Sequence, residues 1–87
     1  MNFSTIVTLL EDYIPAEKIK LYAKAFKLSM EIHDKSWEGG AGYTISKAEA
    51  VSRVGTELGL SNNEQDFMIE CLRYKWNMVN DWVASHK

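Results

Sequence analysis

The C-terminal stretch from Ser61 to Lys87 constrains the fold most, because apolar residues occupy most of its circumference. Ser61 and Glu64 have the spacing of a capping box, in which each side chain accepts from the other residue's backbone N–H, so we expect a helix to begin there. At about 100° per residue, the apolar side chains fill an arc of roughly 200°, wider than the stripe of an ordinary surface helix. The sequence therefore predicts one long, central C-terminal helix that other helices, or a second chain, cover on two sides.

Lys75 lies inside this apolar arc, where a charge is costly unless it reaches water or an acceptor. We expect its ammonium group to extend along the apolar surface to solvent. The alternative is a buried cation that meets a carboxylate or a ligand phosphate.

The rest of the chain also has helical patterns. Apolar residues at helical spacing predict a short helix over residues 3–14, and Pro15 suits the first turn of a second helix that extends to about Ser36. A third helix is expected from Lys47 to a stop at Gly59, and Ser46 with Glu49 forms a second capping box. The 87 residues are thus interpreted as a single all-α domain of four helices, orthogonal or bundle-like.

The second predicted helix has two apolar faces, which a monomer of this size cannot easily bury together. The spare face suggests a homo-oligomer. Lysines follow the polar side, and we interpret them as a solvated face with a Lys27–Glu31 pair, or as a surface for an acidic partner. The candidate partner-binding residues on this helix are Lys20, Leu21, Lys24, Lys27, Leu28 and Ile32.

A glycine-rich loop separates the second and third helices. Glycines allow close approach of a ligand, the start of a helix attracts anions, and flanking aromatic rings stack on planar groups. We therefore consider a site for a small anionic, nucleotide-like ligand, although the loop lacks the ending of a P-loop and ordinary loop chemistry also explains it. The candidate ligand-binding residues are Trp37, Gly39, Gly40, Gly42, Tyr43, Thr44, Ser46 and Lys47.

Composition disfavours several classes of function. The net charge of −2 gives no overall attraction to nucleic acid, and the apolar residues are too interrupted for a membrane span. One cysteine and the absence of a leader pattern favour a reducing, cytoplasmic setting. His33 has no second ligand at helical spacing, and Cys71 lies in the apolar arc, so we expect neither a metal, a cofactor nor catalysis.

Two short segments resemble known families. Residues 54–61 resemble the first helix and turn of a helix-turn-helix DNA reader, in which a small residue, here Gly55, precedes the turn glycine by four positions; Gln65 then stands where that motif has an apolar residue. Residues 45–68 are similar to the helical half-domains of tellurite-resistance TerB-type proteins through Ile45-Ser46, Glu49 and residues 58–61. The acidic metal residues of those proteins are missing here, so this similarity implies no function.

These observations favour a non-enzymatic interaction protein that binds a protein partner and masks or bridges it. By analogy, small acidic chains of this kind serve phages and mobile elements as inhibitors of host components. The alternatives are a small anionic ligand binder that uses the glycine-rich loop, and a helix-turn-helix transcriptional regulator.

Overall fold

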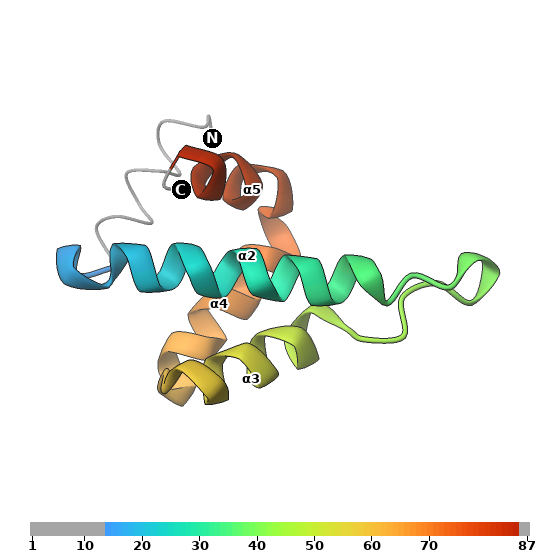
Figure 1. The fold of residues 1–87 in the computed structure, drawn as a ribbon, viewed down its shortest axis with the longest axis horizontal. Coiled ribbons are helices and arrows are strands. Elements are labelled where there is room, and N and C mark those ends of the chain that lie inside the picture. Colours follow the sequence, from blue (N-terminus) through green and yellow to red (C-terminus); the bar gives the residue numbers. More distant parts are fainter. Residues whose placement is uncertain (1–13, 86–87) are drawn as a thin grey trace.

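A computed structural model describes residues 14–85, and over this range the chain consists of helices joined by turns and one loop (Figure 1). The α-helices are α2 (Ile19–Lys35), α3 (Lys47–Leu58), α4 (Asn62–Tyr74) and α5 (Trp76–Ser85). There are also two 3-10 turns: η1 (Ala16–Lys18) directly precedes α2, and η2 (Gly39–Ala41) lies in the loop between α2 and α3. The predicted all-α class is confirmed, whereas the helix expected over residues 3–14 lies outside the described residues except for Ile14, which is buried.

The helix ends that the sequence predicted for α3 and α4 are confirmed. Gly59 adopts φ +76° after α3, and the Leu60 N–H donates to Gly55 O at 2.8 Å, which is the Schellman arrangement. At the start of α4, the Ser61 Oγ accepts from Glu64 N at 3.2 Å and the Glu64 Oε1 accepts from Ser61 N at 3.0 Å. The chain therefore turns from α3 into α4 within three residues, Gly59 to Ser61.

The second predicted capping box forms only in part. Ser46 accepts from Glu49 N at 3.1 Å and so caps α3, but the Glu49 carboxylate accepts from Arg53 Nη2 at 2.9 Å along the exposed side of the helix. Because the Glu49 carboxylate forms this i,i+4 ion pair, it does not accept from the Ser46 backbone N–H, the bond that would complete the capping box.

The prediction of one long C-terminal helix is wrong, because the helix breaks at Lys75. This residue has φ −136° and ψ 33°, which is not helical, and it separates α4 from α5. The break lets one wide apolar arc meet two different neighbours, since α4 packs on α3 and α5 packs on α2 (Figure 1). Lys75 is exposed at the break, which agrees with the expectation that its ammonium group reaches solvent, and the alternative of a buried cation is wrong.

The four described α-helices pack in a ring around one core, with α2 against both α3 and α5, and α4 against both α3 and α5. No single described helix is wrapped by all the others, in contrast to the predicted central C-terminal helix. The rings of Phe26 on α2 and Trp82 on α5 meet edge to face with centroids 5.9 Å apart, and both side chains are fully buried. This contact fixes α5 on α2.

The α3–α4 turn is closed by Gly55 and Gln65. Gly55 is buried, and a Cβ atom added there would lie 2.6 Å from the Gln65 Cγ, so the two helices approach closely at this point. The Gln65 Nε2 donates to Leu60 O at 3.0 Å. A hydrogen-bonded glutamine therefore stands at the position that is apolar in helix-turn-helix proteins.

A polar clasp joins the start of α2 to the start of α4. Tyr22 Oη donates to the Glu64 carboxylate, and Lys18 Nζ lies 3.2 Å from the same carboxylate oxygen. The hydrogen bond from Tyr22, followed by that from the Ser61 backbone, lowers the pKa of Glu64 to about 2. Burial, followed by the hydrogen bond to Glu64, raises the pKa of Tyr22 well above its ordinary value.

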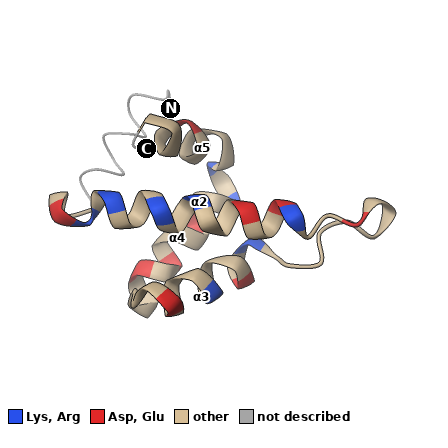
Figure 2. Cartoon of the chain, viewed as in Figure 1, with Lys and Arg blue, Asp and Glu red and all other residues tan. Residues whose placement is uncertain are grey.

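The first half of α2 carries lysines and no carboxylates, whereas its second half carries Glu31 and Asp34 followed by Lys35 (Figure 2). Lys20, Lys24 and Lys27 are exposed, as predicted for the polar side. The other predicted partner-binding residues are half-buried and pack against the core; they are Leu21, Leu28 and Ile32. The chain itself therefore covers part of the face that suggested self-association. Self-association stays a prediction.

Candidate functional site

The loop between α2 and α3 forms a hairpin that extends beyond the helices at the right of Figure 1. We call residues 36–46 the aromatic hairpin. Trp37 and Tyr43 pair as an antiparallel bridge, and Glu38 N–H donates to Gly42 O at 2.8 Å. Gly39 and Gly42 have φ of +59° and +74°, which explains why glycines occupy this tip.

Two more backbone N–H groups of the tip, those of Ala41 and Gly42, donate within the hairpin itself. Ala41 N–H donates to Glu38 O at 3.2 Å and Gly42 N–H to Gly39 O at 3.0 Å, closing η2. Gly40 belongs to the same turn and is exposed. Gly39 and Gly42, which the sequence assigned to a ligand, therefore take part in the hydrogen bonds that shape the turn.

The base of the hairpin is anchored to the end of α2. Thr44 donates twice to Ser36 O, from its backbone N–H at 3.1 Å and from Oγ1 at 3.2 Å. His33 is 7% exposed, and its Nδ1 lies 2.9 Å from Ile45 O. Because a carbonyl oxygen only accepts, Nδ1 carries the proton of this contact. Ser36 closes the anchor by donating from Oγ to His33 O at 2.6 Å.

Aromatic rings follow one another from the anchor to the tip. The Tyr43 ring stacks on His33 with centroids 3.9 Å apart and planes 21° apart, and Trp37 meets Tyr43 edge to face at 4.9 Å. Trp76, the first residue of α5, meets the His33 ring edge to face, with the ring centroids 5.4 Å apart. Trp37 and Tyr43 are nevertheless 56% and 49% exposed. Two large rings are thus presented to solvent on a hairpin whose base is anchored to α2 by hydrogen bonds.

A cleft of about 240 Å³ lies beside the hairpin and is lined by His33, Asp34, Tyr43, Lys47 and Trp76. The Lys47 Nζ lies 4.9 Å from the centre of the Trp76 ring, a cation–π contact. We call this the aromatic cleft.

Only some of the candidate ligand-binding residues lie together in the aromatic cleft. It unites Tyr43 and Lys47, while Thr44 anchors the hairpin and Ser46 caps α3. Trp76 joins them from α5, far along the chain, although it was not among the candidate ligand-binding residues. In the sequence, Trp76 is one of many apolar residues of the C-terminal stretch, and no local pattern indicates that it lines a cleft.

Outside the aromatic cleft, the described residues meet the requirements of neither a metal site, a reactive thiol nor a membrane-spanning helix. Residues 14–85 hold no group of three or more histidine, cysteine, aspartate or glutamate side chains that could bind a metal ion. Burial, followed by the charge of Glu70, raises the pKa of Cys71 to about 11, so its thiol is protonated at neutral pH. None of the helices in the described range combines the length and apolar character that crossing a bilayer requires.

Searches of protein-family models, curated proteins and solved structures found no match to this chain. The function must therefore be inferred from the residues and their arrangement.

Proposed function

We propose that this chain is a non-enzymatic protein-binding module that contacts its partner through the aromatic hairpin and so masks or bridges a surface of that partner. The observation that carries the proposal is the exposure of Trp37 and Tyr43 on an anchored hairpin. Tryptophan and tyrosine are enriched among residues that dominate binding energy at protein interfaces.

The anchoring of the hairpin supports this role. His33, Ser36 and Thr44 hold its base by hydrogen bonds, and Tyr43 is stacked on the buried imidazole. A surface that is already ordered loses little conformational entropy on binding, so more of the contact energy appears as affinity.

A second surface competes with the hairpin in this proposal. Lys20, Lys24 and Lys27 are exposed along α2 and would attract an acidic partner. The hairpin has the stronger support, because isolated surface lysines contribute little to affinity whereas buried aromatic anchors contribute most of it.

Site-specific crosslinking in the source cell separates the two surfaces. A photoreactive phenylalanine analogue replaces Trp37 in one variant and Lys24 in a second, and crosslinked proteins are identified after irradiation. We expect a discrete adduct from position 37, which Tyr43→Ser in the same chain reduces. An adduct from position 24 alone would reject the hairpin in favour of the lysine face, and no adduct from either position would reject the protein-binding function.

The shared position of Tyr43 and Lys47 in the aromatic cleft favours a second candidate, binding of a small anionic, planar ligand such as a nucleotide. Calorimetric titration with ATP and GMP tests it, with Lys47→Ala as the variant that removes the cation. Heat that disappears in this variant would favour the ligand, and no heat from either nucleotide would remove it.

A further inference from the structure

His33 brings an unused hydrogen-bond acceptor to the aromatic cleft. Its Nδ1 lies 2.9 Å from Ile45 O and carries the proton of that contact, because a carbonyl oxygen only accepts. In the neutral ring the other nitrogen, Nε2, then has a free lone pair. Within residues 14–85, Nε2 makes no hydrogen bond. The anchor of the hairpin thus determines which nitrogen is left to accept from a ligand.

This acceptor is held in place and is still within reach. The His33 side chain is 7% exposed, yet it lines the aromatic cleft. Nε2 is not among the enclosed polar atoms of the described residues, so a donor can approach it. A nearly buried ring that offers one open acceptor to a cleft is typical of a ligand site, in which a few polar groups fix the orientation of the ligand.

The walls of the cleft favour a single aromatic ring. Tyr43 stacks on the His33 ring with centroids 3.9 Å apart, and Trp76 meets it edge to face at 5.4 Å. Both rings also line the cleft, and aromatic rings pack well on one another in stacked and edge-to-face arrangements. The volume of about 240 Å³ is below the roughly 300–1,000 Å³ of pockets that bind drug-sized ligands. The cleft therefore has room for the ring of one side chain.

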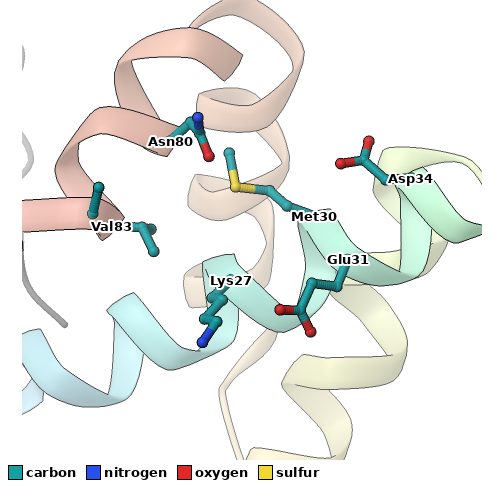
Figure 3. Close-up of a pocket in the computed structure, with 7 residues that line it drawn as sticks. Lys27, Met30, Glu31, Asp34, Asn80 and Val83 are labelled. Carbon is teal, nitrogen blue, oxygen red and sulfur yellow. The ribbon is translucent and has the colours of Figure 1, made fainter.

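The charges of the cleft offset each other. Asp34 and Lys47 line it, one of each sign, so the cleft favours neither a strongly anionic nor a strongly cationic group. Asp34 also borders the cavity between α2 and α5, where its carboxylate points away from that of Glu31 (Figure 3). Lys47 holds its ammonium group 4.9 Å from the centre of the Trp76 ring, and an ammonium group only donates. The cleft thus offers an acceptor, Nε2, and a donor, the Lys47 Nζ.

A hydroxyl group on an aromatic ring matches this pair. A phenol donates its proton to an acceptor and accepts through its lone pairs from a donor, whereas an indole only donates. Tyrosine is the side chain that combines such a hydroxyl with a ring. We propose that the aromatic cleft receives a tyrosine side chain of the protein partner, whose hydroxyl donates to His33 Nε2 and accepts from Lys47. This inference rests on the proposed protein-binding function and adds the chemistry of the partner residue that lies beside the hairpin.

Two probes of nearly the same shape test the hydroxyl. p-Cresol reproduces a tyrosine side chain, and p-methylanisole has the same ring but no donor. Each is titrated into the full chain, and the nitrogen signals of the His33 ring are followed by NMR. We expect the proton on Nδ1 in the free protein, a saturable shift of the Nε2 signal with p-cresol, and about fivefold weaker binding of p-methylanisole without that shift. A proton on Nε2 in the free protein, or equal binding of both probes, would overturn the proposal.

Variants assign the two polar contacts, with binding measured from the Trp76 indole signal. His33→Asn keeps an N–H near the position of Nδ1 for the Ile45 carbonyl and lacks Nε2, so it should lose the preference for p-cresol over p-methylanisole. Lys47→Met keeps an unbranched stem but removes the cation, and should weaken both probes equally, because the oxygen of each accepts. The matched control Lys24→Met, on exposed α2 surface outside the cleft, should bind both as the wild type does. A preference for p-cresol that persists in His33→Asn would contradict the assigned contact. If His33→Asn does not fold, the probe pair on the wild type still decides.

Two further comparisons identify the source of the tyrosine. N-acetyl-L-tyrosinamide resembles a tyrosine within a polypeptide and should bind at least as tightly as p-cresol. Binding of p-cresol alone would mean that the cleft takes free phenols, which overturns the assignment to a partner. If a second copy of the chain supplied the tyrosine, the cleft signals would follow protein concentration and sedimentation equilibrium would give a dimer mass, with the same consequence. Crosslinking from position 37 does not need the cleft, so a failure of these probes is separable from a failure of the hairpin.

Discussion

Glu64 shows how much one side chain does in this fold. Its carboxylate closes the capping box of α4 and at the same time accepts from Tyr22 and pairs with Lys18. The sequence pattern identified the first role, which involves residues three positions apart. The second role joins α4 to the start of α2 and holds two elements that are distant in the chain.

The lowered pKa of Glu64 predicts a specific acid dependence of stability. The folded-state pKa of about 2 lies below the ordinary value of 4.5, so the carboxylate contributes stability that is fully present above about pH 4.5 and is lost as the pH falls toward 2. Glu64→Gln should therefore lower the free energy of unfolding at pH 7, and its difference from the wild type should shrink between pH 4.5 and 2. Urea unfolding at a series of pH values measures this.

Glu57→Gln provides the control for this experiment, because Glu57 is exposed on α3 and lies outside the clasp. It should leave the acid-induced loss of stability in place. A constant difference between wild type and Glu64→Gln across the acid range would contradict the role assigned to the clasp.

At the scale of elements, α3 and α4 begin with similar sequences but unequal caps. Ser46 and Ser61 each accept from the backbone N–H three residues later. Only the α4 cap has the reciprocal bond from its glutamate, since Glu49 is paired with Arg53. The same sequence pattern thus stabilises the two helices to different degrees.

Replacement of each capping serine should reveal this difference. We expect Ser61→Ala to cost about 1–2 kcal/mol and Ser46→Ala about 0.5–1 kcal/mol, because the first also disturbs the position of Glu64 in the clasp. Chemical denaturation of the two variants under identical conditions compares them directly. Equal losses would show that the reciprocal bond and the clasp add nothing to the α4 cap.

At the scale of the whole molecule, the tryptophans differ in role: one supports the fold, and another is exposed where a partner could bind. Trp82 is fully buried and holds α5 on α2 through Phe26, whereas Trp37 is 56% exposed at the hairpin. Trp76 lies between these extremes, half-buried in the aromatic cleft.

Trp82→Ala should therefore cost about 3–5 kcal/mol, a large part of the stability of a domain of this size. Trp37→Ser should change stability by less than about 0.5 kcal/mol, as is usual at exposed positions. Thermal unfolding followed by circular dichroism distinguishes the two. Marked destabilisation by Trp37→Ser would mean that the hairpin tip supports the fold, and would weaken its assignment as a contact surface.

The sequence by itself determined the all-α class, the bounds of α3 and the start of α4, because caps, glycine stops and helical periodicity are local properties of the chain. Tertiary structure alone decided that the C-terminal helix breaks at Lys75 and that Trp76 turns toward His33 and Tyr43. A wide apolar arc states how much surface must be buried but not which neighbours bury it. That choice depends on contacts between residues far apart in the chain, which no local pattern encodes.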